Sequence, residues 1–123
     1  YIQYAHARIC RVFEKLQERG LSFTIDQGLH ALSALNAEVE RELVKKLAAY
    51  PETVHQAAVA YEPHQLSNYL KDLASQFHGW YNDHIVLHDD AQIRHARLIL
   101  SLAVKRVIAN GLGLLGVQAP EKM

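Results

Sequence analysis

The sequence is poor in residues that interrupt helices, with only three prolines and six glycines among its 123 residues. Proline cannot continue a helix beyond its first turn and glycine weakens a helix interior, so their scarcity permits long helical segments. No segment convincingly shows the alternating pattern of a half-buried strand, and we find no internal repeat or low-complexity segment. These absences favour an all-α class.

Cysteine occurs once, as Cys10, which excludes an internal disulfide and suits a reducing cytosol. No apolar run approaches the length of a membrane span and we recognise no signal peptide, so we expect a cytoplasmic protein with no membrane partner. The chain begins without methionine and inside a helical pattern. We therefore expect a fragment of a longer protein.

The sequence also has no formal net charge, because 13 lysines and arginines balance 13 aspartates and glutamates. A protein that binds nucleic acid through its overall charge is usually basic, so any such binding here would be local. Residues 1–20 offer a local basic region, with four basic and two acidic side chains.

Motifs of catalysis are absent as well. His84 and His88 are spaced like two zinc ligands on a helix, but no HExxH motif and no third ligand accompany them, so we expect surface histidines and no metal site. GLGLLG follows a helical pattern and not a strand, which argues against a dinucleotide loop. The carboxylates of NAEVERE suit a helix N-terminus better than acid–base chemistry. We find no catalytic residue.

Periodicity of about 3.6 residues predicts one domain, residues 1–123, built as a bundle of about four long helices plus short ones. The long helices are expected at residues 2–19, 37–49, 63–87 and 91–116, and the short ones at about 27–35 and 51–62. The last helix is apolar around most of its circumference and should lie near the centre. The tail, residues 117–123, has no pattern that predicts a partner.

Several residues mark the expected boundaries and core. Gly20 should stop the first helix, Asn36 should cap the second, and Asp89 or Asp90 should cap the last. Pro51 and Pro63 should begin helices. In the second long helix, the buried side is predicted to consist of Val39, Leu43, Val44 and Leu47. The core stripe of the third is predicted to be Leu66, Tyr69, Leu70, Leu73, Phe77 and Trp80.

The first helix has two distinct faces when its residues are placed at about 100° intervals. One face is apolar: Ile2, Ala5, Ile9, Val12, Phe13 and Leu16. The other, here called the basic stripe, lies about a quarter-turn away: Tyr1, Tyr4, Arg8, Arg11, Lys15 and Arg19. The stripe is either a solvated basic face or a surface on which rings stack on bases and cations meet phosphates.

Three separate motifs resemble arginyl-tRNA synthetases. YIQYAHARIC is similar to the YxQYAHxR stretch of these enzymes, and ARLILSLAVKRVIANGLGLLGVQAPEKM is similar to their ending, including the APExM terminus. Between them, residues 50–82 carry a YP turn, a YL-x-x-LA run and an FxxxYN run in family order. The resemblance covers nearly the whole chain and implies a C-terminal DALR-type anticodon-binding domain with an α-helical bundle fold.

The resemblance implies tRNA-Arg as the partner. The parent enzyme would activate arginine with ATP and Mg²⁺ and esterify it to the tRNA, as an arginine–tRNA ligase. Its HIGH-type and KMSKS-type motifs are absent from this sequence, so the fragment should bind RNA without catalysis and without a cofactor of its own. We expect it to dock on the catalytic domain of a monomeric parent enzyme.

The resemblance also assigns individual residues to the anticodon: Tyr1, Tyr4, Arg8, Tyr81 and Met123. The remaining cations of the basic stripe extend away from the tyrosines and suit the tRNA backbone: Arg11, Lys15 and Arg19. The sequence departs from some family members at Ile85, where they carry an aromatic residue.

Two other interpretations stay open at this point. A structural bundle could use its basic stripe to dock a protein partner, and would then bind RNA weakly and without sequence preference. The chain could instead be the helical domain of a related class I enzyme, such as the cysteinyl-tRNA synthetase, although the APEKM terminus argues against this.

Overall fold

The computed structural model describes residues 1–123, and all of its regular elements are helical. In chain order they are α1 (Ile2–Glu18), α2 (Ile25–His30), the 3₁₀-helix η1 (Leu32–Ala34), α3 (Glu38–Ala48), α4 (Tyr50–Val59), α5 (Pro63–Asp83) and α6 (Ala91–Leu114). The predicted all-α class is confirmed. None of the helices combines the length and the apolar character that crossing a membrane requires.

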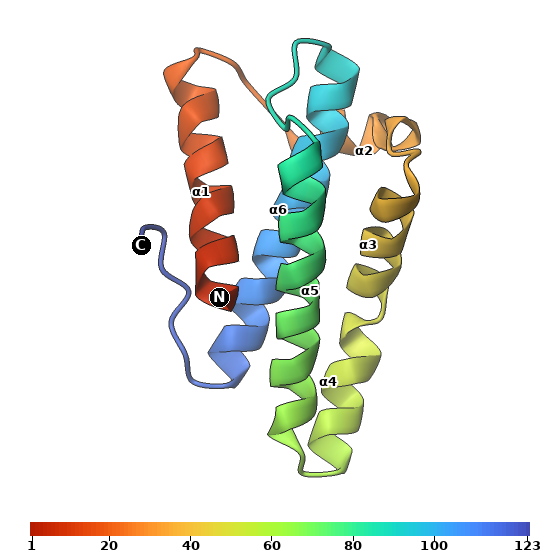
Figure 1. The fold of residues 1–123 in the computed structure, drawn as a ribbon, viewed down its shortest axis with the longest axis vertical. Coiled ribbons are helices and arrows are strands. Elements are labelled where there is room, and N and C mark those ends of the chain that lie inside the picture. The colour runs from red at the N-terminus through yellow and green to blue at the C-terminus, as the bar shows by residue number, and fades with distance from the viewer.

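The bundle consists of three long helices and one column made of two shorter ones (Figure 1). Helices α3 and α4 follow one another with only Ala49 between them, and both pack along α5. Helix α6 contacts α1, α2, α3, α5 and η1, so it lies at the centre as its apolar sequence predicts. The short helix expected at residues 27–35 is divided into α2 and η1.

Helix α1 turns its predicted apolar face to the core. Ala5, Ile9, Val12 and Leu16 are buried, and Ile2 and Phe13 lie at the edge of the core. The helix stops at Gly20, which has a φ of +69°. Its N–H donates to the Gln17 carbonyl, and the following N–H of Leu21 donates to Leu16. These two bonds satisfy carbonyls at the end of α1. They go with a positive φ at Gly20, which glycine adopts more readily than other residues.

The prediction for α3 is wrong in two respects. Asn36 does not cap the helix; the N-cap is Ala37, whose N–H donates to the Glu40 carboxylate over 3.1 Å. Val39 and Val44 are 39% and 45% exposed, whereas Glu40 is buried. The physical reason is Trp80, a fully buried residue of α5 whose indole N–H donates to Glu40 over 3.1 Å. A buried indole N–H needs an acceptor, and α3 turns a carboxylate inward to supply it.

The starts of α5 and α6 follow the sequence more closely. Pro63 begins α5, and Asp90 caps α6 by accepting bonds from the N–H groups of Gln92 and Ile93. Helix α5 ends at Asp83, earlier than expected, because His84 is extended. The residues that were expected to prolong α5 form a loop instead, from which Val86 and Leu87 are buried.

Candidate nucleic-acid interface

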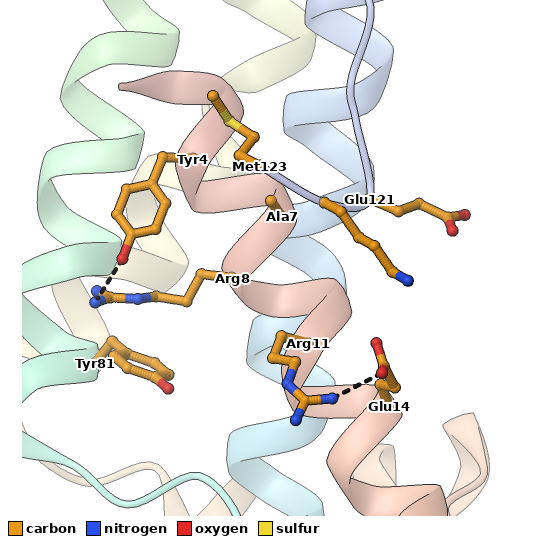
Figure 2. A pocket seen from close by; sticks show the side chains of 9 residues that line it. Tyr4, Ala7, Arg8, Arg11, Glu14, Tyr81, Glu121 and Met123 are labelled. Carbon is orange, nitrogen blue, oxygen red and sulfur yellow. Dashed lines mark hydrogen bonds and ion pairs between the residues drawn. The ribbon is translucent and has the colours of Figure 1, made fainter.

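Arg8 is the centre of a cluster that joins α1 to α5. Its Nη2 donates a 3.3 Å hydrogen bond to the hydroxyl of Tyr4, one turn earlier in α1. Its guanidinium carbon lies 4.4 Å from the centroid of the Tyr81 ring, which α5 supplies. A guanidinium over an aromatic face is attracted by the ring electrons, so these contacts hold Arg8 between the two rings (Figure 2).

His78 lies directly behind this cluster and is 8% exposed. Arg8 Nη1 donates a 3.0 Å hydrogen bond to His78 Nδ1. The rings of Tyr1 and Tyr4 lie 5.0 Å and 5.5 Å from the imidazole. Burial, followed by the charge of Arg8, lowers the pKa of His78 below its ordinary value. The imidazole is therefore uncharged near neutral pH, and Nδ1 accepts the bond because a guanidinium has only donors.

A hollow of about 460 Å³ opens beside Arg8. Tyr4, Arg8 and Tyr81 line one part of it, and the end of the chain, including Met123, lines another (Figure 2). Tyr4 is 46% exposed, so part of its ring is available to a ligand. The hollow thus combines aromatic faces, three cations, two carboxylates and a thioether in a space of ligand size.

The tail reaches this hollow because α1 holds it, although no pattern in residues 117–123 predicts this contact. The side-chain amide of Gln3 donates to the carbonyl of Gln118 over 2.9 Å. His6 Nδ1 donates to the carbonyl of Pro120 over 2.8 Å. Ala119 packs against the core between these two bonds. The tail therefore runs along α1 in a defined position (Figure 1).

The other cations of the basic stripe differ in their surroundings. Arg11 forms ion pairs with Glu14 at 2.7 Å and Glu18 at 3.3 Å, so its charge is partly balanced. Lys15 and Arg19 are exposed and form no ion pair. They line a second hollow of about 330 Å³ that shares Tyr81 with the first.

Ile85, the position at which the sequence departs from the expected family pattern, lines this second hollow and is 70% exposed. Its side chain offers an apolar contact but no π face. The aromatic surface of the interface is accordingly concentrated around Arg8.

The structure thus places all of the predicted residues except Tyr1 at two adjoining hollows. The first brings together Tyr4, Arg8, Arg11, Tyr81 and Met123. The second takes Lys15 and Arg19, and Tyr1 lies outside both hollows, against His78. Sequence reasoning missed His78 and His6. His78 could have been noticed because it precedes Tyr81 by three residues, which places both on one side of a helix.

The two histidines with zinc-like spacing do not share a helix face. His84 follows the end of α5 and donates from Nδ1 to the carbonyl of Trp80. His88 lies in the loop, where its Nδ1 accepts a bond from the N–H of Asp90. No group of three or more His, Cys, Asp or Glu side chains is arranged to hold a metal ion. Burial raises the pKa of the Cys10 thiol, which disfavours the nucleophilic thiolate.

An all-helical bundle with an open hollow of tyrosine rings and an arginine that forms no ion pair has the composition of a surface for unstacked nucleotides. The chain belongs to the DALR anticodon-binding domain family, whose match extends over residues 2–123. The family predicted from the three sequence motifs is therefore confirmed, together with the helical fold that it implied.

Similar proteins agree with this assignment. The arginine–tRNA ligases of Acinetobacter baumannii (strain AYE) and Thioalkalivibrio sulfidiphilus are 57% and 51% identical to the chain over 123 residues. These matches cover 100% of the chain and 21% of each relative, so the chain spans about a fifth of their length.

Two solved structures also resemble the whole chain. The Thermus thermophilus arginyl-tRNA synthetase matches with a TM-score of 0.83 and 34% identity, over 21% of that protein. A protein from Campylobacter jejuni described as a putative arginyl-tRNA synthetase matches with a TM-score of 0.77 and 29% identity, over 26% of its length. The helical arrangement in Figure 1 is thus shared with these enzymes.

Proposed function

We propose that the chain reads the anticodon loop of tRNA-Arg as the anticodon-binding domain of an arginine–tRNA ligase. Membership of the DALR family supports the class of function. The observation that carries the site is the placement of Arg8 between the rings of Tyr4 and Tyr81 at an open hollow. The parent enzyme would be cytoplasmic and monomeric. It would use ATP and Mg²⁺ in a separate catalytic domain on which this domain docks.

Anticodon bases are single-stranded and can be turned outward, so side chains can contact their faces and edges. Tyr4 supplies a partly exposed ring for stacking, and Arg8 supplies donors for a base edge or a phosphate. Met123 lies at the same hollow and offers a polarisable apolar contact. Tyr81 supplies a second ring to the lining of the hollow, and Tyr1 extends the aromatic surface beyond His78.

The remaining cations fit the tRNA backbone. Lys15 and Arg19 carry charges that no carboxylate balances, so each can release a counterion on meeting a phosphate. Arg11 would first have to exchange its bonds to Glu14 and Glu18. We therefore assign the larger backbone contribution to Lys15 and Arg19.

The test is a fluorescence titration of the chain with three RNAs: tRNA-Arg, the same tRNA with a substituted anticodon, and tRNA-Cys. We expect tRNA-Arg to bind at least about tenfold more tightly than the others, which corresponds to ~1.4 kcal/mol. Equal and salt-sensitive binding of all three would contradict anticodon reading and leave a basic docking face. Preference for tRNA-Cys would assign the domain to the cysteinyl enzyme.

A further inference from the structure

We propose that His78 is a positioning residue that fixes the guanidinium of Arg8 at the hollow without cancelling its positive charge. The inference rests on the proposed function, because the charge of Arg8 matters here only if it faces RNA. It adds a role for a side chain that is itself buried and, in this structure, does not line the hollow.

The first observation is that only uncharged groups hold Arg8. One terminal nitrogen donates to His78 Nδ1 at 3.0 Å and the other to the Tyr4 hydroxyl at 3.3 Å. Arg8 forms no ion pair with any carboxylate. Arg11, one turn further along α1, differs from Arg8 because it forms ion pairs with two glutamates. The same helix thus carries one arginine with a balanced charge and one with an unbalanced charge.

The second observation is the protonation state that this geometry requires. An arginine has only donors, so His78 Nδ1 must accept and the ring proton must reside on Nε2. His78 Nε2 is buried and makes no hydrogen bond, although the Tyr1 backbone lies close enough to the ring to oppose part of the lowering of its pKa. Leaving a buried donor unpaired is unfavourable. An apolar residue at this position would not bury an unpaired N–H. We therefore infer that the useful feature of His78 is Nδ1, which accepts the hydrogen bond from Arg8.

A histidine at position 78 has a different effect on Arg8 from that of a carboxylate. A carboxylate would bind the guanidinium more strongly, but it would balance its charge and repel phosphates. The imidazole accepts one bond and also packs against the rings of Tyr1, Tyr4 and Phe77. It therefore orders Arg8 before RNA arrives, so that less side-chain freedom is lost on binding.

The experiment compares His78→Asn, His78→Asp and His78→Leu in the 123-residue chain. Asparagine places a neutral acceptor near the position of Nδ1, aspartate places a charged one there, and leucine removes the acceptor. We expect His78→Asn to bind tRNA-Arg within about threefold of the unmodified chain, and His78→Leu to bind about tenfold more weakly. His78→Asp should also bind more weakly than His78→Asn, although the two side chains have nearly the same shape.

A double-mutant cycle with Arg8→Ala separates positioning from a structural role. If His78 acts through Arg8, the three substitutions should change tRNA-Arg affinity by less than about twofold once Arg8 is absent. Equal losses in the two backgrounds would overturn the proposal, and so would His78→Asp binding as tightly as His78→Asn. Circular dichroism establishes folding. If His78→Leu does not fold, the Asn and Asp pair decides alone.

A measurement without RNA keeps this inference distinct from the proposed function. At neutral pH, the ¹⁵N spectrum of the His78 imidazole should show Nε2 protonated and Nδ1 unprotonated, and Arg8→Ala should shift the Nδ1 resonance. A charged imidazole, or the opposite tautomer, would overturn the positioning role even if tRNA-Arg is recognised. Failure of the unmodified chain to prefer tRNA-Arg would instead refute the proposed function, while these spectra would still report the pairing.

Discussion

His6 Nδ1 donates a 2.8 Å hydrogen bond to the carbonyl of Pro120, so the first helix holds the last segment of the chain. His6 is 4% exposed, and its bond to the less buried Pro120 is partly shielded from water. Gln3 holds the neighbouring carbonyl of Gln118. These two bonds bring Met123 to the hollow that Arg8 and Tyr81 line. Met123 is itself 76% exposed, so we expect its position to depend chiefly on these two bonds to α1.

The first prediction is that deleting Glu121–Met123 weakens binding of tRNA-Arg and leaves the melting temperature nearly unchanged. None of the deleted side chains makes a hydrogen bond or an ion pair in the fold, so little stability should be lost. A fluorescence titration gives the affinity and a circular dichroism melt gives the stability. His6→Leu is the matched variant: it releases the tail without shortening it and should weaken binding similarly. Unchanged affinity after the deletion would remove Met123 from the interface.

The second prediction concerns the buried bond between Glu40 and Trp80. Glu40→Ala removes the acceptor of the indole N–H and the partner of the Ala37 N–H. We expect it to lower the free energy of unfolding by about 2–4 kcal/mol, because a buried donor is left unpaired and a helix start loses its cap.

Glu42→Ala, on the exposed side of α3, is the control and should cost less than about 0.5 kcal/mol. Urea unfolding of both variants measures the difference. Similar midpoints for the two would contradict a stabilising role for the Glu40–Trp80 bond.

The outcome for α3 illustrates what the sequence could and could not predict. Helices α1, α5 and α6 were predictable because apolar residues recur along them at helical spacing. In addition, Gly20 marks the end of α1, and Pro63 and Asp90 mark the starts of α5 and α6. The buried side of α3 was not, because the inward turn of Glu40 satisfies an indole that lies 40 positions away in the sequence.

The candidate site, like α3, could be predicted from the sequence only in part. Tyr4 and Arg8 could be predicted as neighbours because they are one helical turn apart on one face. Their meeting with Tyr81 and Met123 depends on how α1, α5 and the tail pack together, which helical periodicity within single segments does not determine. The spacing of His78 to Tyr81 places both residues on one side of α5, but it does not show that Arg8 of α1 lies against His78.

The third prediction is a pH dependence of stability that comes from His78. Burial, followed by the charge of Arg8, lowers its pKa in the folded chain below the ordinary value of 6.5. The unfolded chain then binds the proton more readily, so the free energy of unfolding should fall as the pH drops below about 6.5. The decline should level off once the pH lies below the lowered pKa.

His78→Asn should show a shallower decline over the same range, because asparagine does not titrate. Urea titrations of both proteins between about pH 7.5 and 5.5 provide the comparison, and the other seven histidines are common to both. Identical pH profiles would mean that His78 does not carry this dependence.

The last prediction separates base reading from backbone contact within the basic stripe. Tyr4 lies at the hollow with Arg8, whereas Lys15 is exposed beside the second hollow. Losing a stacked ring costs about 1–3 kcal/mol. Losing one phosphate contact reduces the slope of log K against log salt by roughly one unit. Tyr4→Ala should therefore weaken binding to tRNA-Arg far more than to the anticodon-substituted tRNA, with little change in salt slope.

Lys15→Ala should weaken binding to both RNAs by a similar factor and flatten the salt dependence. Titrations of both variants against both RNAs at several salt concentrations test these contrasts, with circular dichroism as the control for folding. Tyr4→Ala removes the hydrogen bond from Arg8 to Tyr4 but leaves the bond from Arg8 to His78 available, so we expect Arg8 to keep its place and attribute a loss specific to tRNA-Arg to the ring. If Tyr4→Ala lowers both affinities equally, Tyr4 does not read the anticodon. Helix α1 would then be a basic docking face edged by a structural tyrosine.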